Sequence, residues 1–259
     1  MFDTGKVAIV TGVGPGMGTS IAVGLARQGV DVAIAARRSE RLEAAAEQIR
    51  AVGREPLIFP LDITDADGCR ALIRATAERF GGVDFLVQNG HDEGDWSPAT
   101  DADLDRWRRV FEVNFFGSLG LVQAAVPEMR KRGGGSIVFI SSGAAIQAPP
   151  GMGAYAASKA ALQSLTRSLA LELGPSKIRV NDVMLGATQG ETLNEAAKKA
   201  SVAAGLTPEE WLARKPKDFA LGAIPTPEEC AGTVLYLCSN LARPVTGHHV
   251  AVNGGQWIL

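Results

Sequence analysis

The stretch VAIVTGVGPGMGTS, residues 7–20, joins a short apolar strand to a glycine-rich turn and the start of a helical pattern. Gly12, Gly14, Gly16 and Gly18 permit a tight turn in which backbone N–H groups approach a pyrophosphate closely. The helix that begins near Met17 points its positive end at the same anion. A glycine-rich patch alone is a weak signal, but its place between the first strand and an apolar-periodic helix is typical of a dinucleotide-binding fold.

Short apolar runs rich in β-branched residues alternate with helical patterns along the rest of the chain. Their apolar content is continuous, as expected for strands that are buried on both faces of a parallel sheet. This alternation predicts an α/β, single-domain Rossmann fold over residues 1–259, with a doubly wound seven-stranded parallel sheet and helices on both faces. The expected strands are 7–11, 30–36, 56–63, 83–89, 136–142, 178–185 and 248–253.

Composition and charge are those of an ordinary globular protein. The 259 residues are 46% hydrophobic and 21% charged with a net charge of −2, which gives no electrostatic reason to expect nucleic acid or an anionic membrane as partner. No apolar run approaches the roughly 18 residues that span a bilayer. The three cysteines form no CxxC pair, and the N-terminus lacks the pattern of a signal peptide. We therefore expect a reducing cytoplasmic location.

The tip of the second strand bears on the choice of cofactor. It reads AIAARRSE, with Arg37 and Arg38 where an NAD site would usually place an acid for the ribose 2′-hydroxyl. Two guanidiniums can hold a 2′-phosphate, so NADP(H) is favoured and NAD(H) stays possible. The alternative interpretation is that both are surface arginines that open a helix.

The stretch SSGAAIQAPPGMGAYAASKAALQSL, residues 141–165, carries the densest chemical signal. Tyr155 and Lys159 are four residues apart on one face of a predicted helix. Lowering the pKa of a phenol by about three units requires about 4 kcal/mol of differential stabilisation, which a neighbouring ammonium can supply. Ser142 ends a buried strand, where ligands of open α/β sheets bind. Taken singly, each residue is also compatible with a turn, a core tyrosine or a solvated lysine.

Together these motifs resemble the classical short-chain dehydrogenase/reductase family. The resemblance rests on TGVGPGMG (11–18), Asn114 in FEVNFFG, Ser142, and YAASK (155–159), and it extends over essentially the whole chain. It implies that Tyr155 is the catalytic acid/base and that Lys159 lowers its pKa and holds the nicotinamide ribose. Ser142 would orient the substrate oxygen, and Asn114 would hold a water of a proton relay near Lys159.

The resemblance also implies a set of cofactor contacts beyond the glycine-rich loop. Asp62 and the backbone of Ile63 would face the adenine, and Asn89 the adenosine ribose. Gly186 and Thr188 would lie at the nicotinamide amide, although the Pro-Gly usual there is Leu185-Gly186 and the expected threonine is Gly190.

The loop in FLVQNGHDEGDW, residues 85–96, has a second interpretation. A histidine among three acids could bind a metal or supply acid–base catalysis, as in a metal-dependent hydrolase. His91 replaces the glycine expected in the family, so a role in shaping the substrate pocket is favoured and no metal is expected. We expect Asp92, Glu93 and Asp95 to form a solvated loop before a helix capped near Thr100.

Residues 186–225 form a candidate lid. This segment is helix-rich and carries Trp211 and further apolar side chains that could line a pocket for a bulky apolar, alicyclic or steroid-like substrate, or simply pack the lid onto the body. The closing GQWIL is apolar for a free terminus. In similar proteins the last strand and its flanking helix make subunit contacts, so we expect a homotetramer.

The leading hypothesis is an NAD(P)(H)-dependent oxidoreductase that interconverts a ketone and a secondary alcohol by hydride transfer, with a small carbonyl or alcohol compound as substrate. The main alternative is a catalytically silent sensor or scaffold that keeps the dinucleotide-binding fold. A sensor would have no need for Asn114, Ser142, Tyr155 and Lys159 together.

Overall fold

Seven parallel strands form one sheet in the order β3-β2-β1-β4-β5-β6-β7, which confirms the predicted topology. The computed structural model describes residues 1–258, except the side chain of Ala203, so Leu259 of the apolar C-terminal stretch lies outside the described residues. Each strand begins or ends within a few residues of its predicted limits. The strands are β1 (Val7–Thr11), β2 (Asp31–Ala36), β3 (Leu57–Pro60), β4 (Phe85–Gln88), β5 (Gly135–Ser142), β6 (Ile178–Leu185) and β7 (His249–Val252).

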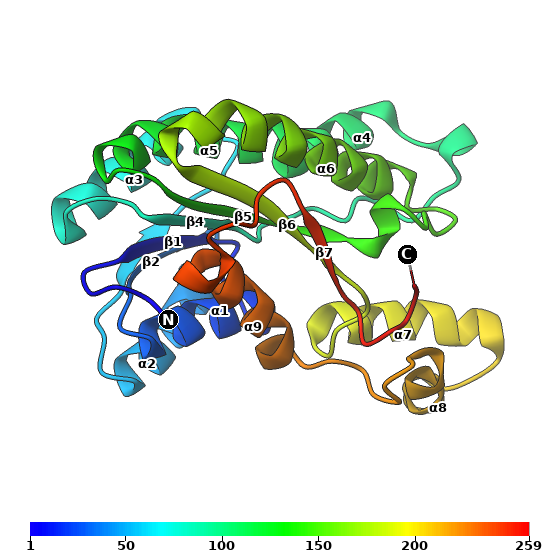
Figure 1. Ribbon diagram of the computed structural model, residues 1–259. Helices are drawn as coiled ribbons and strands as arrows, with labels where there is room; N and C mark the ends of the chain where they lie inside the picture. Colours follow the sequence, from blue (N-terminus) through cyan, green and yellow to red (C-terminus); the bar gives the residue numbers. More distant parts are fainter. Residues whose placement is uncertain (259) are drawn as a thin grey trace.

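Helices cover both faces of the sheet (Figure 1). On one face lie α1 (Met17–Arg27), α2 (Ser39–Ala51) and α9 (Pro227–Cys238), and on the other lie α3 (Ala66–Phe80), α4 (Leu104–Phe111), α5 (Ser118–Lys131) and α6 (Gly153–Leu173). Successive strand side chains enter opposite layers, so Ala8 and Val10 belong to one hydrophobic core and Ile9 to the other. This two-sided burial explains why the strands are apolar throughout.

Two late helices each begin with the sequence Thr-Pro-Glu-Glu, at residues 207–210 and 226–229. Thr207 begins α8 (Pro208–Arg214) and Thr226 begins α9. Each threonine hydroxyl accepts a hydrogen bond from the third helical N–H, and the carboxylate of the glutamate at that position accepts one from the threonine N–H. These capping boxes satisfy backbone donors that a helix start otherwise leaves open.

A π-helical turn, Glu112–Gly117, joins α4 to α5. The resulting helical stretch, Leu104–Lys131, is long and apolar enough to cross a membrane by length and composition alone. Within the fold, however, Leu121, Val122 and Ala125 are buried in the core between the sheet and the layer of α3, α5 and α6. The stretch is apolar because one of its faces packs in the core.

Short 3₁₀ turns lie at Ala99–Asp101, Gly143–Ala145, Gly174–Ser176, Lys215–Asp218 and Asn240–Ala242.

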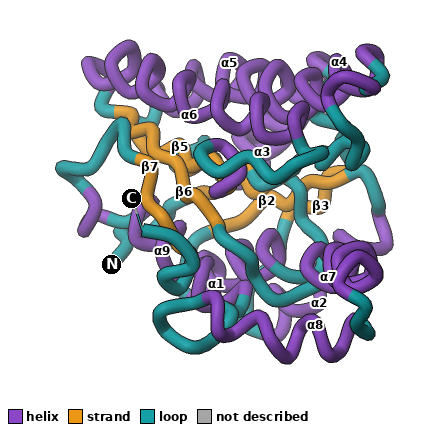
Figure 2. The backbone as a smooth tube through the Cα atoms, turned by 90° about the vertical axis from the view of Figure 1, so that its right-hand side faces the viewer, coloured by secondary structure: helices purple, strands orange, loops and turns teal. Residues whose placement is uncertain are grey.

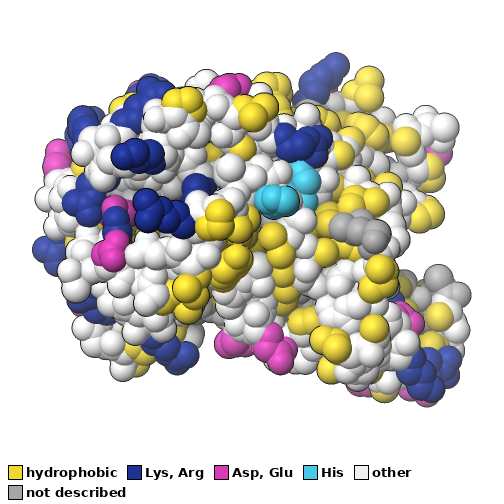
Figure 3. All heavy atoms as spheres, viewed as in Figure 1, with side chains coloured by type: hydrophobic (Ala, Val, Ile, Leu, Met, Phe, Trp, Pro, Cys, Tyr) yellow, Lys and Arg dark blue, Asp and Glu magenta, His cyan; other side chains and the backbone are white. Residues whose placement is uncertain are grey.

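The segment predicted as a lid forms α7 (Glu191–Ala204) and α8, which pack together beyond the ends of β6 and β7 (Figures 1 and 2). Leu193 and Phe219 are buried, whereas Trp211 is half-buried and Leu221 is exposed. Hydrophobic side chains gather where this segment meets the body of the molecule (Figure 3). Part of the apolar content of the segment is thus used to pack it onto the body.

Candidate active site

One cleft of about 750 Å³ opens at the carboxyl ends of the central strands. Strand order reverses around β1 and β4, so the loops that follow these strands separate and leave a crevice between them. Every site residue predicted from the sequence lines this cleft except Asn114. The lining set includes Gly12, Gly14, Gly16, Met17, Gly18, Arg37, Arg38, Asp62, Ile63, Asn89, His91, Ser142, Tyr155, Lys159, Gly186, Thr188 and Trp211.

The glycine-rich loop is held in place by the end of β4. Gly12 has a φ of 66°, and a Cβ there would overlap the backbone of Gly90. The Asn89 side-chain amide donates a hydrogen bond to the Gly12 carbonyl at 2.8 Å. Asn89 therefore fixes the loop, a role that the sequence reasoning did not assign to it beside its expected contact with the ribose.

Gln88 is a buried residue of this region that the sequence reasoning missed. Its side-chain oxygen accepts a hydrogen bond from the Thr11 hydroxyl, and its amide donates to the Ser118 hydroxyl at 2.8 Å. Gln88 thereby links β4 to β1 on one side and to α5 on the other. A glutamine among apolar neighbours in a strand is the signal that could have marked it, because a buried amide needs such partners.

The tip of β2 presents three guanidiniums to the cleft instead of two. Arg37 and Arg38 are exposed, and within residues 1–258 neither has a carboxylate at ion-pair distance. Arg41, on the first turns of α2, also lines the cleft and pairs with Glu191 of α7 at 3.1 Å. The sequence reasoning missed Arg41, although its spacing of four residues from Arg37 could have indicated it.

Ser142 and Tyr155 meet at the inner end of the cleft. The Ser142 hydroxyl accepts a hydrogen bond from the Ala144 N–H at 3.2 Å, which leaves its own proton free to donate. Burial raises the pKa of the Tyr155 phenol above its ordinary value, and the nearby Ser142 hydroxyl lowers it only in part. In the cofactor-free protein the phenol is thus a protonated acid.

Lys159 is buried behind Tyr155, with 2% of its surface exposed. Its Nζ lies 5.6 Å from the centre of the Tyr155 ring and donates a hydrogen bond to the Ile140 carbonyl at 2.7 Å. Burial lowers the pKa of Lys159 to about 8, and the buried Asp182 carboxylate opposes this shift. The expected lowering of the Tyr155 pKa by Lys159 is not seen in the cofactor-free protein, because desolvation of the buried phenol is the largest effect on this pKa.

Replacing Lys159 with methionine is expected to stabilise the cofactor-free protein more at pH 7 than at pH 10. With a folded pKa of about 8 and an ordinary value of 10.5, the unfolded chain binds more protons between these values, so wild-type stability rises with pH there. The methionine variant lacks this dependence. Its stability relative to wild type should therefore fall by about 2 kcal/mol from pH 7 to pH 10.

Urea unfolding at both pH values measures this difference. Lys217→Met, at an exposed position, is the matched control and should show no comparable pH-dependent change. An identical pH response in the two variants would mean that burial does not perturb Lys159.

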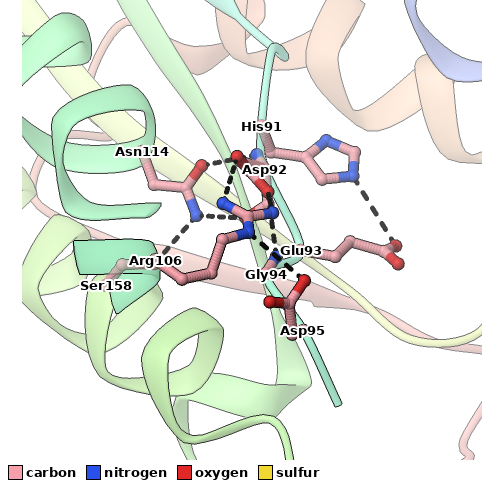
Figure 4. Close-up of polar contacts among 8 residues, drawn as sticks. All are labelled: His91, Asp92, Glu93, Gly94, Asp95, Arg106, Asn114 and Ser158. Atoms are coloured by element: carbon pink, nitrogen blue, oxygen red, sulfur yellow. Dashed lines mark hydrogen bonds and ion pairs between the residues drawn. The ribbon is translucent and has the colours of Figure 1, made fainter. Parts of the chain in front are cut away.

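Asn114 acts on the loop after β4 and does not reach the cleft itself. It lies in the π-helical turn with 1% of its surface exposed. Its side-chain oxygen accepts from the Asp92 N–H at 2.7 Å, and its amide donates to the Asp92 carbonyl and to the Ser158 hydroxyl, both at 2.9 Å (Figure 4). Both side-chain N–H groups are used by these bonds, and the side chain holds the loop after β4, a role that the sequence did not predict.

The sequence predicted a solvated loop for the acids that follow β4, but two of these acids are paired with an arginine. Arg106 of α4 binds both carboxylate oxygens of Asp92 at 2.5 and 2.8 Å and also reaches Asp95 at 3.3 Å (Figure 4). These hydrogen bonds hold the pKa of Asp92 below its ordinary value. The helix start near Thr100 was also wrong: Asp103 caps α4 by accepting from the Asp105 N–H.

His91, on the same loop, lies near Tyr155 in the cleft. Its ring centre lies 6.1 Å from that of Tyr155, and its nearest acid is Glu93, at 3.8 Å from Nε2. Asp92 and Asp95 are paired instead with Arg106 (Figure 4). Among the described residues, no three metal-ligating side chains converge, here or elsewhere. The geometry therefore favours a pocket residue over a metal ligand.

Two glycines after β6 are explained by their surroundings: Gly190, which stands where the family pattern has a threonine, and Gly186, which that pattern keeps. Gly190 has a φ of 136°, a conformation in which a threonine would be strained. A Cβ on Gly186 would lie 2.7 Å from the Gln256 side chain, so the closing residues of the chain occupy the space beside it.

Comparison with known proteins places this fold and cleft in a family. A family model described as short chain dehydrogenase matches residues 6–201. Trans-4-hydroxycyclohexanecarboxylate dehydrogenase of Sinomonas cyclohexanicum is 37% identical over 97% of this chain and 92% of that protein. The match extends over nearly the whole length of both proteins.

Solved structures agree with this assignment. L-sorbose reductase from Gluconobacter frateurii, complexed with NADPH and L-sorbose, superposes with a TM-score of 0.92 and 30% identity, covering 99% of this chain and 98% of that one. NAD⁺-bound xylitol dehydrogenase superposes with a TM-score of 0.90 and 28% identity, covering 97% and 99%. Fold, cleft and relatives together define an oxidoreductase with a Rossmann-type fold. More narrowly, the chain belongs to the short-chain dehydrogenase/reductase family, in its classical form.

Proposed function

We propose that this protein interconverts a ketone and a secondary alcohol by hydride transfer, with Tyr155 as the acid/base and NADP(H) as the favoured cofactor. The observation that carries the proposal is the convergence of Ser142, Tyr155 and Lys159 in the same cleft as the glycine-rich loop. A bound nicotinamide dinucleotide supplies or accepts the hydride. The residues of the chain then have to orient the substrate oxygen and move one proton.

In the direction of reduction, the Ser142 hydroxyl donates a hydrogen bond to the carbonyl oxygen and holds it beside Tyr155. The carbonyl carbon receives the hydride, and the Tyr155 phenol gives its proton to the oxygen, which becomes the hydroxyl of the alcohol. The buried Lys159 ammonium stabilises the phenolate that forms. Oxidation is the reverse, with the phenolate taking the proton of the alcohol.

The preference for NADP(H) rests on the β2 tip. Arg37 and Arg38 have no acidic partner among the described residues, and Arg41 adds a third positive charge at the same end of the cleft. A 2′-phosphate supplies the anion that these guanidiniums would bind. The two solved relatives differ here, since one was determined with NADPH and the other with NAD⁺.

An alicyclic substrate fits the other end of the cleft best. Its lining is rich in large apolar groups, including Trp96, Met152, Leu193, Trp211 and Trp257. The Sinomonas relative is a dehydrogenase of trans-4-hydroxycyclohexanecarboxylate, a compound with a cyclohexane ring.

For the whole protein we further propose a homotetramer in the cytoplasm, with α7 and α8 acting as a lid over the substrate.

A panel of alicyclic and open-chain ketones, assayed with NADPH and NADH, tests this function. We expect turnover of alicyclic ketones, with kcat/KM at least tenfold higher with NADPH than with NADH, and no effect of a metal chelator. Tight NADPH binding without turnover of any ketone or of the corresponding alcohols would instead favour the sensor or scaffold. Loss of activity on adding chelator would favour metal chemistry near His91.

A further inference from the structure

The last residues of the chain fold back after β7 and run toward α7 (Figure 1). Gly254 and Gly255 make this reversal, with φ values of 58° and 77°. The Asn253 side chain closes it, because its oxygen accepts from the Gly255 N–H at 2.9 Å and its amide donates to the Trp257 carbonyl at 2.7 Å. The tail therefore has a defined path up to Trp257.

This tail is fixed to two sides of the cleft. The Gln256 side-chain oxygen accepts a hydrogen bond from the Ala187 N–H at 2.8 Å, just after β6. On the lid side, the Ala220 and Leu221 N–H groups donate to the carbonyls of Gly255 and Gly254, at 3.3 and 3.1 Å. Trp257 is thus anchored from both the sheet and the segment that follows α8.

The Trp257 indole lies directly against the residue that follows Ser142. A Cβ on Gly143 would be 2.6 Å from the indole Cζ2 and 2.8 Å from its Nε1, so only a glycine leaves room for the ring. Trp257, Ser142 and Tyr155 line the same cleft. The neighbouring Ile258, by contrast, is 82% exposed. Of these two apolar residues of the tail, Trp257 thus faces the cleft and Ile258 faces solvent.

We propose that Trp257 is a specificity-determining residue, whose indole forms the wall against which the ring of a cyclic substrate packs. The inference rests on the proposed function, since Ser142 and Tyr155 must hold the substrate oxygen for the ring to lie beside the indole. A flat, rigid aromatic surface favours a ring over a short flexible chain, because the ring covers more of it without losing conformational freedom. Selection of the substrate would thus depend on Trp257, in the segment after β7, as well as on the lid.

Steady-state kinetics of Trp257→Ala with cyclohexanone and 2-butanone tests this role. We expect KM for cyclohexanone to rise roughly tenfold, as apolar contact with the ring is lost, with kcat changed less than threefold. Values for 2-butanone and the dissociation constant of NADPH should change less than threefold. Trp257→Phe should recover most of the affinity for cyclohexanone, and Ile258→Ala is the matched control for a change in the tail.

A second variant approaches the indole from the other side. Gly143→Ala places a methyl group where the ring lies, so it should displace the indole and give the same selective rise in KM for cyclohexanone. An equal loss for both ketones in Trp257→Ala, or no loss for either, would overturn the proposal.

A binding measurement separates this inference from the proposed reaction. If the wild type reduces neither ketone, the proposed function fails, and saturation-transfer NMR of cyclohexanol with the protein and NADP⁺ still decides the role of Trp257. Transfer to the ring that is present in wild type and lost in Trp257→Ala supports it. Transfer that is equal in the two proteins, or missing from both, overturns it.

Discussion

Tyr155→Phe is expected to lower kcat by about 10³-fold while leaving the dissociation constant of the cofactor within about threefold of wild type. The variant keeps the ring that packs in the cleft and removes only the proton that the substrate oxygen needs. General acid–base groups contribute roughly 10² to 10⁴ to the rate, so loss of the phenol proton is expected to have an effect of this size. Burial already keeps the phenol protonated, as the acid role requires.

Stopped-flow single-turnover rates and a fluorescence titration with NADPH measure the two quantities separately. The chain has one other tyrosine, Tyr236 on α9, and Tyr236→Phe is the matched control with unchanged kinetics expected. If Tyr155→Phe retained more than a tenth of the wild-type rate, the mechanism would have to use another proton donor.

The double variant Arg37→Ala/Arg38→Ala is expected to raise the NADPH dissociation constant by roughly 10³-fold and the NADH constant by less than about threefold. Charge-assisted hydrogen bonds contribute about 1.5–3 kcal/mol each, and the 2′-phosphate is the only group by which the two cofactors differ. Because both arginines are exposed and lack acidic partners among the described residues, their removal should cost little stability.

Isothermal titration of each cofactor against wild type and variant gives the four constants. Arg70→Ala, on the exposed side of α3, controls for the loss of surface charge. Equal weakening for NADPH and NADH would defeat the 2′-phosphate assignment. Adding Arg41→Ala to the double variant then shows whether the third guanidinium, now paired with Glu191, contributes to the same anion.

The positions of the three side chains proposed to act in catalysis followed from local sequence patterns. The four-residue spacing of Tyr155 and Lys159 puts both on one face of α6 once that helix forms, and Ser142 ends β5 because the apolar run ends there. Parallel strands share one carboxyl edge, so the glycine-rich loop and Ser142 had to meet at it. The hydrogen bonds of Asn89, Gln88 and Asn114 could not be predicted from local pattern, because each depends on a partner from another part of the chain.

By itself, the sequence determined the seven-stranded sheet, the glycine-rich loop and the presence of Ser142, Tyr155 and Lys159 at the cleft, since these depend on periodicity and on spacing within single elements. Only the tertiary structure decided that Arg106 holds Asp92, that Asp103 caps α4, and that Trp257 returns to lie on Gly143. These contacts join residues whose distance in space is set by the packing of whole elements, and that packing leaves no local signal in the chain.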